Sequence, residues 1–170
     1  MKRYSLGLDY GTNSMRAVIV ELSTGREVVE MVENYPSGID GIIIDPNNPH
    51  LARQNPADYM VCLEKIGKKL KIAMRENAIQ PEDIIGIGVD TTGSTPIPVD
   101  ENFMPVCFKK EFKTNKNAMA WLWKDHTSAD EAEEITNLAK KIRPQYLSKI
   151  GGVYSSEWFF SKILHLLRTD

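Results

Sequence analysis

Short apolar runs separated by polar turns open the chain. Tyr4–Asp9 has the pattern of a short buried strand, and Arg16–Leu22 and Glu27–Glu33 follow as two more strand candidates. The polar residues 10–14 and a Thr-Gly pair separate these runs and are typical of tight turns. The pattern predicts an antiparallel β-meander whose third strand, with its many charges, lies at or near a sheet edge.

A loop and a helix are expected next. Proline, glycine and asparagine punctuate the segment from Tyr35 to Pro56, so we expect a long excursion without regular structure there. Asn55 is typical of a helix N-cap, and Pro56 of the first helical position. Apolar residues then recur at helical spacing, which predicts a helix of about five turns. They are Met60, Leu63, Ile66, Leu70 and Ala73.

The second half of the chain continues with one strand and two helices. Ile84–Asp90 is a continuous apolar run, typical of a strand buried on both faces of a parallel sheet, whose carboxyl end commonly binds ligands. Ser128 and Glu131 have the spacing of a capping box that opens a helix. Ser155 or Ser156 is expected to cap the last helix, which carries Trp158, Phe159, Ile163, Leu164 and Leu167. The order of elements predicts an α/β fold.

Composition narrows the class of protein. A length of 170 residues predicts one domain, and 21 basic against 23 acidic residues leave no excess charge for binding nucleic acid. No apolar run approaches the roughly 18 residues of a membrane span, and no signal-peptide core follows Met1, so we expect a cytoplasmic protein without a membrane partner. Cys62 and Cys107 stand alone, which indicates reduced thiols rather than a zinc site.

The first turn has the chemistry of a phosphate site. A glycine lets the backbone approach a ligand, while hydroxyls and turn N–H groups donate to phosphate oxygens. The candidates are Gly11, Thr12, Asn13, Ser14 and Arg16. Asp9 precedes them, and a carboxylate beside phosphates indicates a bridging Mg²⁺ and hence a metal nucleotide. An ordinary hairpin turn capped by Asp9 explains the same residues equally well.

Three later segments have the chemistry of a sugar site. Hydroxyls crowd residues 90–96, and such groups suit a polyhydroxylated ligand, although a simple Ser/Thr-rich turn has the same composition. Residues 121–126 place two tryptophans beside a cation, an acid and an imidazole. Glu157 stands at a predicted helix start, where an anion is favourable whatever its function. Each segment alone also has a purely structural explanation.

Taken in order, the segments 7–16, 86–96, 122–126 and 151–158 resemble the N-terminal part of the FGGY carbohydrate kinases, and among these the enzymes that phosphorylate ribulose. The resemblance spans essentially the whole chain. It implies an actin-like, ribonuclease-H-like α/β domain, with a mixed sheet flanked by helices, that closes on a second such domain.

The resemblance also implies roles for individual residues. Asp9 would hold Mg²⁺, and Gly11, Thr12, Asn13, Ser14 and Arg16 would line the phosphate path. The residues expected to contact the sugar are Thr92, Ser94, Thr95, Lys124, Asp125 and Glu157.

The implied reaction transfers the γ-phosphoryl group of MgATP to L-ribulose, a step of L-arabinose catabolism. The general base and the ATP-binding C-terminal domain are expected beyond Asp170, so residues 1–170 form an incomplete sugar-binding domain that should be almost inactive alone. A sugar- or nucleotide-binding module, a polymerising or chaperone-type ATPase, and a kinase for another ketose or polyol are the alternatives. The sequence leaves a homo-oligomer open.

Overall fold

The computed structural model describes residues 2–170, which fold into two compact units. The first unit contains the described residues up to Ile42 together with Asn55–Thr92. The second contains Ile43–Gln54 and Gly93–Asp170. The chain therefore crosses between the units three times.

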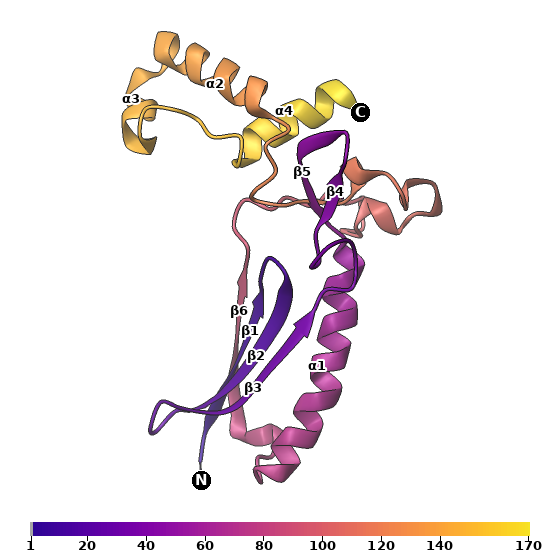
Figure 1. Ribbon diagram of the computed structural model, residues 1–170. Coiled ribbons are helices and arrows are strands. Elements are labelled where there is room, and N and C mark those ends of the chain that lie inside the picture. Colours follow the sequence, from indigo (N-terminus) through magenta and orange to yellow (C-terminus); the bar gives the residue numbers. More distant parts are fainter. Residues whose placement is uncertain (1) are drawn as a thin grey trace. The chain divides into compact units, whose positions relative to one another are not determined.

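A four-stranded mixed sheet forms the centre of the first unit (Figure 1). Its strands are β1 (Tyr4–Tyr10), β2 (Ser14–Glu21), β3 (Arg26–Asn34) and β6 (Ile84–Thr91), in the order β3-β2-β1-β6. β2 runs antiparallel to both of its neighbours, β1 and β3, whereas β6 runs parallel to β1. The predicted meander and the edge position of its third strand are confirmed.

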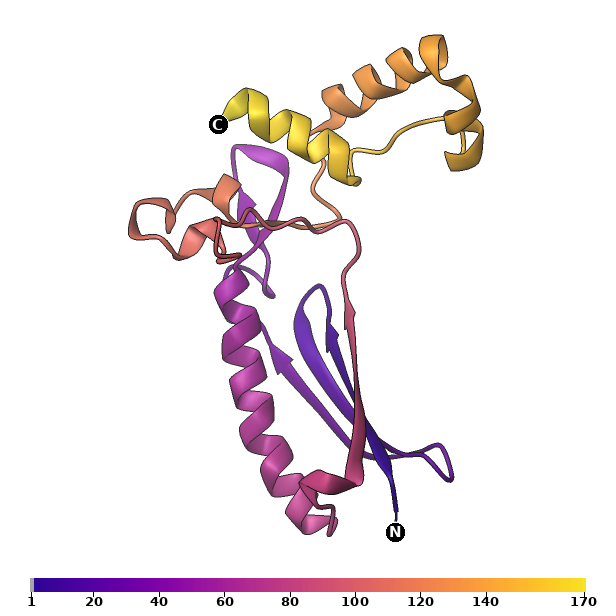
Figure 2. The same cartoon turned by 180° about the vertical axis from the view of Figure 1, so that it is seen from behind.

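One long helix, α1 (Pro56–Glu76), covers one face of this sheet (Figures 1 and 2). Its N-terminus forms as predicted, because the Asn55 side chain accepts a hydrogen bond of 3.1 Å from the Ala57 amide. The predicted apolar face is partly wrong, since Met60 is 60% exposed and Cys62 is buried instead. Helical spacing of four from Cys62 leads to Ile66 and Leu70, which are buried with it.

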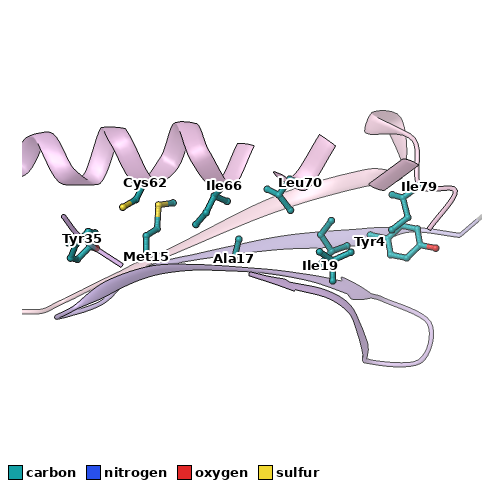
Figure 3. Packing of buried hydrophobic residues seen from close by; sticks show 10 residues of the cluster. Tyr4, Met15, Ala17, Ile19, Tyr35, Cys62, Ile66, Leu70 and Ile79 are labelled. Atoms are coloured by element: carbon teal, nitrogen blue, oxygen red, sulfur yellow. The ribbon is translucent and has the colours of Figure 1, made fainter. Parts of the chain in front are cut away.

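The core of the first unit lies between α1 and the sheet (Figure 3). Three alternate residues of β2, Met15, Ala17 and Ile19, face the helix, as strand geometry requires. Cys62 and Ile66 point down onto these side chains from α1. Residues of β2 with the opposite parity therefore face away from the helix.

The expectation for β6 is wrong in one respect. Ile85, Ile87 and Val89 are exposed by 55%, 65% and 62%, so the strand is not buried on both faces within the described residues. β6 is an edge strand of the sheet. A continuous apolar run identifies a strand but does not identify its position within the sheet.

The second unit contains a small sheet that the sequence did not predict. Its strands are β4 (Ile43–Asp45), β5 (Asn48–Gln54) and β7 (Ala120–Trp121), all antiparallel. The expectation of an irregular loop from Tyr35 to Pro56 is therefore wrong. Asp45 accepts a 2.9 Å hydrogen bond from the Asn47 amide and closes the β4–β5 turn, and Pro49 follows where the strand register shifts.

The helices of the second unit are α2 (Ala129–Ile142), the short α3 (Pro144–Leu147) and α4 (Phe159–Thr169). The predicted capping box does not form, because Ser128 Oγ donates to the Ser156 carbonyl at 3.1 Å instead. Neither Ser155 nor Ser156 caps α4, which begins after Trp158. No helix among residues 2–170 is long and apolar enough to cross a membrane.

Candidate functional site

The predicted site residues divide between the two units. The first unit contains Asp9, Gly11, Thr12, Asn13, Ser14, Arg16 and Thr92. The second contains Ser94, Thr95, Lys124, Asp125 and Glu157. The structure therefore gathers the phosphate and metal candidates in one group and most of the sugar candidates in another.

The β1–β2 turn is a tight cradle of backbone. Gly11 donates its amide to the Ser14 carbonyl at 3.0 Å, which closes the hairpin. A Cβ atom on Gly11 would lie 3.1 Å from that carbonyl oxygen and 3.5 Å from the Arg16 guanidinium, so glycine keeps this space open. Asn13 anchors the turn to the following loop, since its side chain donates to the Asp40 carbonyl at 2.7 Å.

Asp9 and Arg16 face each other across the hairpin. They are register partners, and the guanidinium lies 2.6 Å from the carboxylate. Their parity places both on the sheet face that α1 does not cover. Asp90 of β6 pairs in register with Asp9 and extends the same row. A cavity of about 450 Å³ on this face is lined by these three residues, together with Glu27 and Glu30.

This group fits a magnesium nucleotide. Within residues 2–170, no three or more His, Cys, Asp or Glu side chains are grouped so that they could hold a metal ion. Mg²⁺ in nucleotide sites usually takes one or two carboxylates and completes its shell with phosphate oxygens and water. Asp9 has the chemistry of such a carboxylate, and the adjacent Arg16 is a cation of the kind that pairs with phosphate oxygens.

The segment after β6 continues from one unit into the other. In the first unit, Thr92 donates its amide to the Tyr10 carbonyl at 3.1 Å and so lies beside the end of β1. In the second unit, Ser94 is exposed and has a left-handed backbone, with φ of 53°. Thr95 Oγ1 donates to the Gly93 carbonyl at 3.2 Å.

Asp125 lies in the interior of the second unit, with 0% of its surface exposed. One carboxylate oxygen accepts from the Ala52 amide at 2.7 Å, and the other accepts from the Thr127 hydroxyl at 2.6 Å and its amide at 3.1 Å. Arg53 forms a buried ion pair with the same carboxylate. All four partner groups come from the protein itself, and no part of the carboxylate is exposed.

Arg53 is the other half of this buried pair and is 1% exposed. Its guanidinium carbon lies 3.4 Å from the centre of the Trp121 ring, a close cation–π contact. Burial lowers the pKa of Arg53 to about 9, which still leaves the guanidinium charged at neutral pH. Trp121 is 2% exposed, whereas Trp123 is 40% exposed and is the tryptophan of this segment that a ligand can reach.

Glu157 and Lys124 are half-buried and occur on neighbouring segments of the second unit. A hydrogen bond of 2.9 Å between His126 Nδ1 and Ser156 Oγ joins these segments. Ser155 Oγ accepts from the Glu157 amide at 3.1 Å and fixes the backbone just before α4. The geometry thus brings the Lys124 and Glu157 segments together.

Two buried cations of this unit, Arg53 and Lys162, were missed by the sequence analysis. Lys162 occurs on the same face of α4 as Phe159, Ile163 and Leu166, which line one apolar cavity with it. A lysine within an apolar helical stripe was a detectable signal. Arg53 gave no such signal, because its segment was expected to be an irregular loop.

Comparison with known proteins decides the family. The model of the FGGY family of carbohydrate kinases, N-terminal domain, matches residues 4–170. The chain belongs to this family. Among its relatives, the ribulokinase of Shouchella clausii is 40% identical over 175 residues, and that of Vibrio parahaemolyticus is 40% identical over 170 residues. The alignments cover 100% and 99% of this chain but only 30% of each FGGY relative.

Solved structures show the same fold. A xylulose kinase from Brucella ovis superposes with a TM-score of 0.72 at 19% identity, covering 98% of this chain and 30% of that one. The glycerol kinase of Plasmodium falciparum with ADP gives a TM-score of 0.68 at 17% identity, covering 99% and 29%. The predicted actin-like α/β fold of an FGGY kinase is confirmed, and the chain spans about a third of its relatives' length.

Proposed function

We propose that the protein to which this chain belongs transfers the γ-phosphoryl group of MgATP to a hydroxyl of L-ribulose. The ribulokinases of Shouchella clausii and Geobacillus thermodenitrificans, at 40% and 37% identity over nearly the whole chain, support the substrate. The observation that carries the reaction is the glycine-closed hairpin with Asp9 and Arg16 side by side. This pair presents the charges that a metal-bound phosphate needs.

In this proposal the first unit binds the phosphates of the nucleotide and its Mg²⁺. Asp9 would hold Mg²⁺, while Arg16 would pair with phosphate oxygens instead of with Asp9. The turn residues Gly11, Thr12, Asn13 and Ser14 would donate to the same phosphates through amides and side chains. Magnesium neutralises charge on the transferring phosphoryl group, and the protein supplies position. Because the reaction needs a supply of MgATP, the proposal places the protein in the cytoplasm.

In the same proposal the second unit binds the sugar. Ser94, Thr95, Lys124 and Glu157 would bond its hydroxyls. Thr92, the last residue of the first unit, stays a predicted sugar contact. The exposed ring of Trp123 suits the apolar edge of a sugar. Because its carboxylate is buried against Arg53, Asp125 would act by fixing the backbone of the Lys124 segment rather than by touching the sugar.

A coupled assay of ADP release by the intact protein tests this proposal. L-ribulose, D-ribulose, ribitol, xylulose and glycerol serve as acceptors at matched concentrations. We expect the highest kcat/KM with L-ribulose. A clear preference for xylulose, ribitol or glycerol would identify a kinase for another ketose or polyol. Absence of turnover with every acceptor, in protein that binds sugar by calorimetry, would favour a binding module.

A further inference from the structure

Lys162 is a buried cation within the apolar face of α4. Only 1% of its surface is exposed, although its neighbours on this face are Phe159, Ile163 and Leu166. Burying an ammonium group without hydrogen-bond partners costs free energy, so the partners of Lys162 indicate its role in the fold. The proposed function gives this side chain no role.

The ammonium of Lys162 binds backbone carbonyls from two distant segments. Its Nζ lies 2.7 Å from the Leu122 carbonyl and 2.9 Å from the Ser94 carbonyl. The carbonyls of Trp121 and Trp123 are farther away, at 3.4 and 3.5 Å. Three donors on one nitrogen can serve several acceptors at once, which no neutral side chain of this shape can do.

Both segments carry residues proposed to contact the sugar. Ser94 is itself one of them, and its left-handed backbone, with φ of 53°, is unfavourable for a residue other than glycine unless its surroundings hold it. The Leu122 carbonyl lies two residues before Lys124. One ammonium therefore fixes the backbone from which Ser94, Thr95 and Lys124 project.

The neighbouring residue of α4 holds a third segment. Ser161 is fully buried, and its hydroxyl is 3.0 Å from the Ser155 carbonyl and 2.9 Å from the Trp158 carbonyl. These carbonyls flank Glu157. The start of α4 thus contacts the backbone of all three segments of the second unit that carry proposed sugar contacts.

We infer that Lys162 is a positioning residue for the sugar, holding the Ser94 and Lys124 segments in one fixed arrangement through their carbonyls. The inference rests on the proposed function for the identity of the sugar, and on the structure alone for the arrangement. Because only 1% of its surface is exposed, we expect Lys162 to make no contact with the substrate. Its effect is therefore expected on sugar binding and not on the nucleotide.

The test compares Lys162→Met and Lys162→Arg with the wild type in the intact protein. Met keeps the length and apolar stem of lysine without its donors, whereas Arg keeps the charge and the donors. We expect Lys162→Met to raise the KM for L-ribulose by about 10- to 100-fold, as small misplacements of binding groups do, with the KM for MgATP changed less than about twofold. Lys162→Arg should recover part of this loss. Lys141→Met, an exposed lysine of α2, is the matched control and should leave both values unchanged.

Hydrogen exchange supplies a readout that does not depend on turnover. In Lys162→Met the amides of residues 93–95 and 122–124 should exchange faster than in the wild type, while those of β1 and β2 should not. If the wild type phosphorylates no acceptor, the proposed function fails, and this exchange pattern still decides the positioning role. Unchanged exchange at both segments, or an unchanged KM for sugar in folded Lys162→Met protein, would overturn the inference. The variant could instead lose kcat only in proportion to a smaller folded fraction, with both KM values unchanged. That result would show a purely structural role for Lys162 and would also overturn the inference.

Discussion

Replacing Asp125 by asparagine isolates the buried ion pair of the second unit. The substitution keeps the size of the side chain and one carbonyl oxygen, which can still accept from Thr127. The amide group then takes the place of the oxygen that accepts from Ala52 and pairs with Arg53. The new amide NH₂ group, a hydrogen-bond donor, would then face the Ala52 amide and the Arg53 guanidinium, which are donors too. Arg53 would remain buried without a countercharge.

The expected loss is large because the pair is fully buried. Removing one partner of a buried ion pair typically costs about 3–5 kcal/mol. Every 1.4 kcal/mol corresponds to about a factor of ten in an equilibrium constant. If the Ala52 amide exchanges its hydrogen through local opening of this region, its exchange should therefore become at least about 100-fold faster. Tryptophan-monitored denaturation of the intact protein should show the corresponding destabilisation.

Asp130→Asn is the matched control for this variant. Asp130 is exposed in the first turn of α2, where the helix dipole favours a carboxylate by only about 0.5 kcal/mol. Its loss should leave exchange at Ala52 unchanged. If Asp125→Asn destabilises the protein by less than about 1 kcal/mol, the assignment of Asp125 to a buried structural pair is refuted.

Two further predictions concern the protein's stability. Burial and the nearby Arg53 lower the pKa of Lys162 to about 8 from an ordinary 10.5, so the unfolded chain binds this proton more tightly than the folded chain. The free energy of unfolding of the wild type should therefore rise by up to about 3 kcal/mol between pH 8 and 10.5, and that of Lys162→Met should lack this rise. Urea denaturation at each pH measures both proteins. Equal pH profiles of the two would contradict the prediction. Gly41 has φ of 81°, and a Cβ there would lie 2.8 Å from the Tyr35 Cβ, so Gly41→Ala should cost about 2–4 kcal/mol. Gly67→Ala, inside α1 with open space around it, should instead stabilise the protein by about 0.5–1 kcal/mol. Urea denaturation measures both variants, and equal effects of the two alanines would contradict the strain argument.

Local signals in the sequence were sufficient for the β-meander and for the start of α1. The β-meander follows from alternating apolar residues and two short turns, and the start of α1 follows from Asn55 and Pro56. Such features depend on residues close together in the chain. The burial of Cys62 in place of Met60 was not visible, because it depends on which side of the helix meets the sheet.

Long-range pairing limited the prediction of the second unit. β4 has three residues and β7 has two, and β5 pairs with β7 across more than sixty residues of chain, so no periodicity marks them. The same limit applies to the site. Residue type made Asp125 a candidate for binding sugar, but only the fold shows that Arg53 and three protein donors occupy its carboxylate.

Separate kinetic effects of Asp9 and Glu157 test the central claim most directly. The measurement is the KM for Mg²⁺, MgATP and L-ribulose, with kcat, for Asp9→Asn and Glu157→Gln in the intact protein. The account predicts that Asp9→Asn lowers kcat and raises the Mg²⁺ requirement with little change in the KM for sugar, while Glu157→Gln raises the KM for sugar alone. A wild-type Mg²⁺ titration in Asp9→Asn, or a sugar KM unaffected by Glu157→Gln, would contradict the division of roles proposed for the two units.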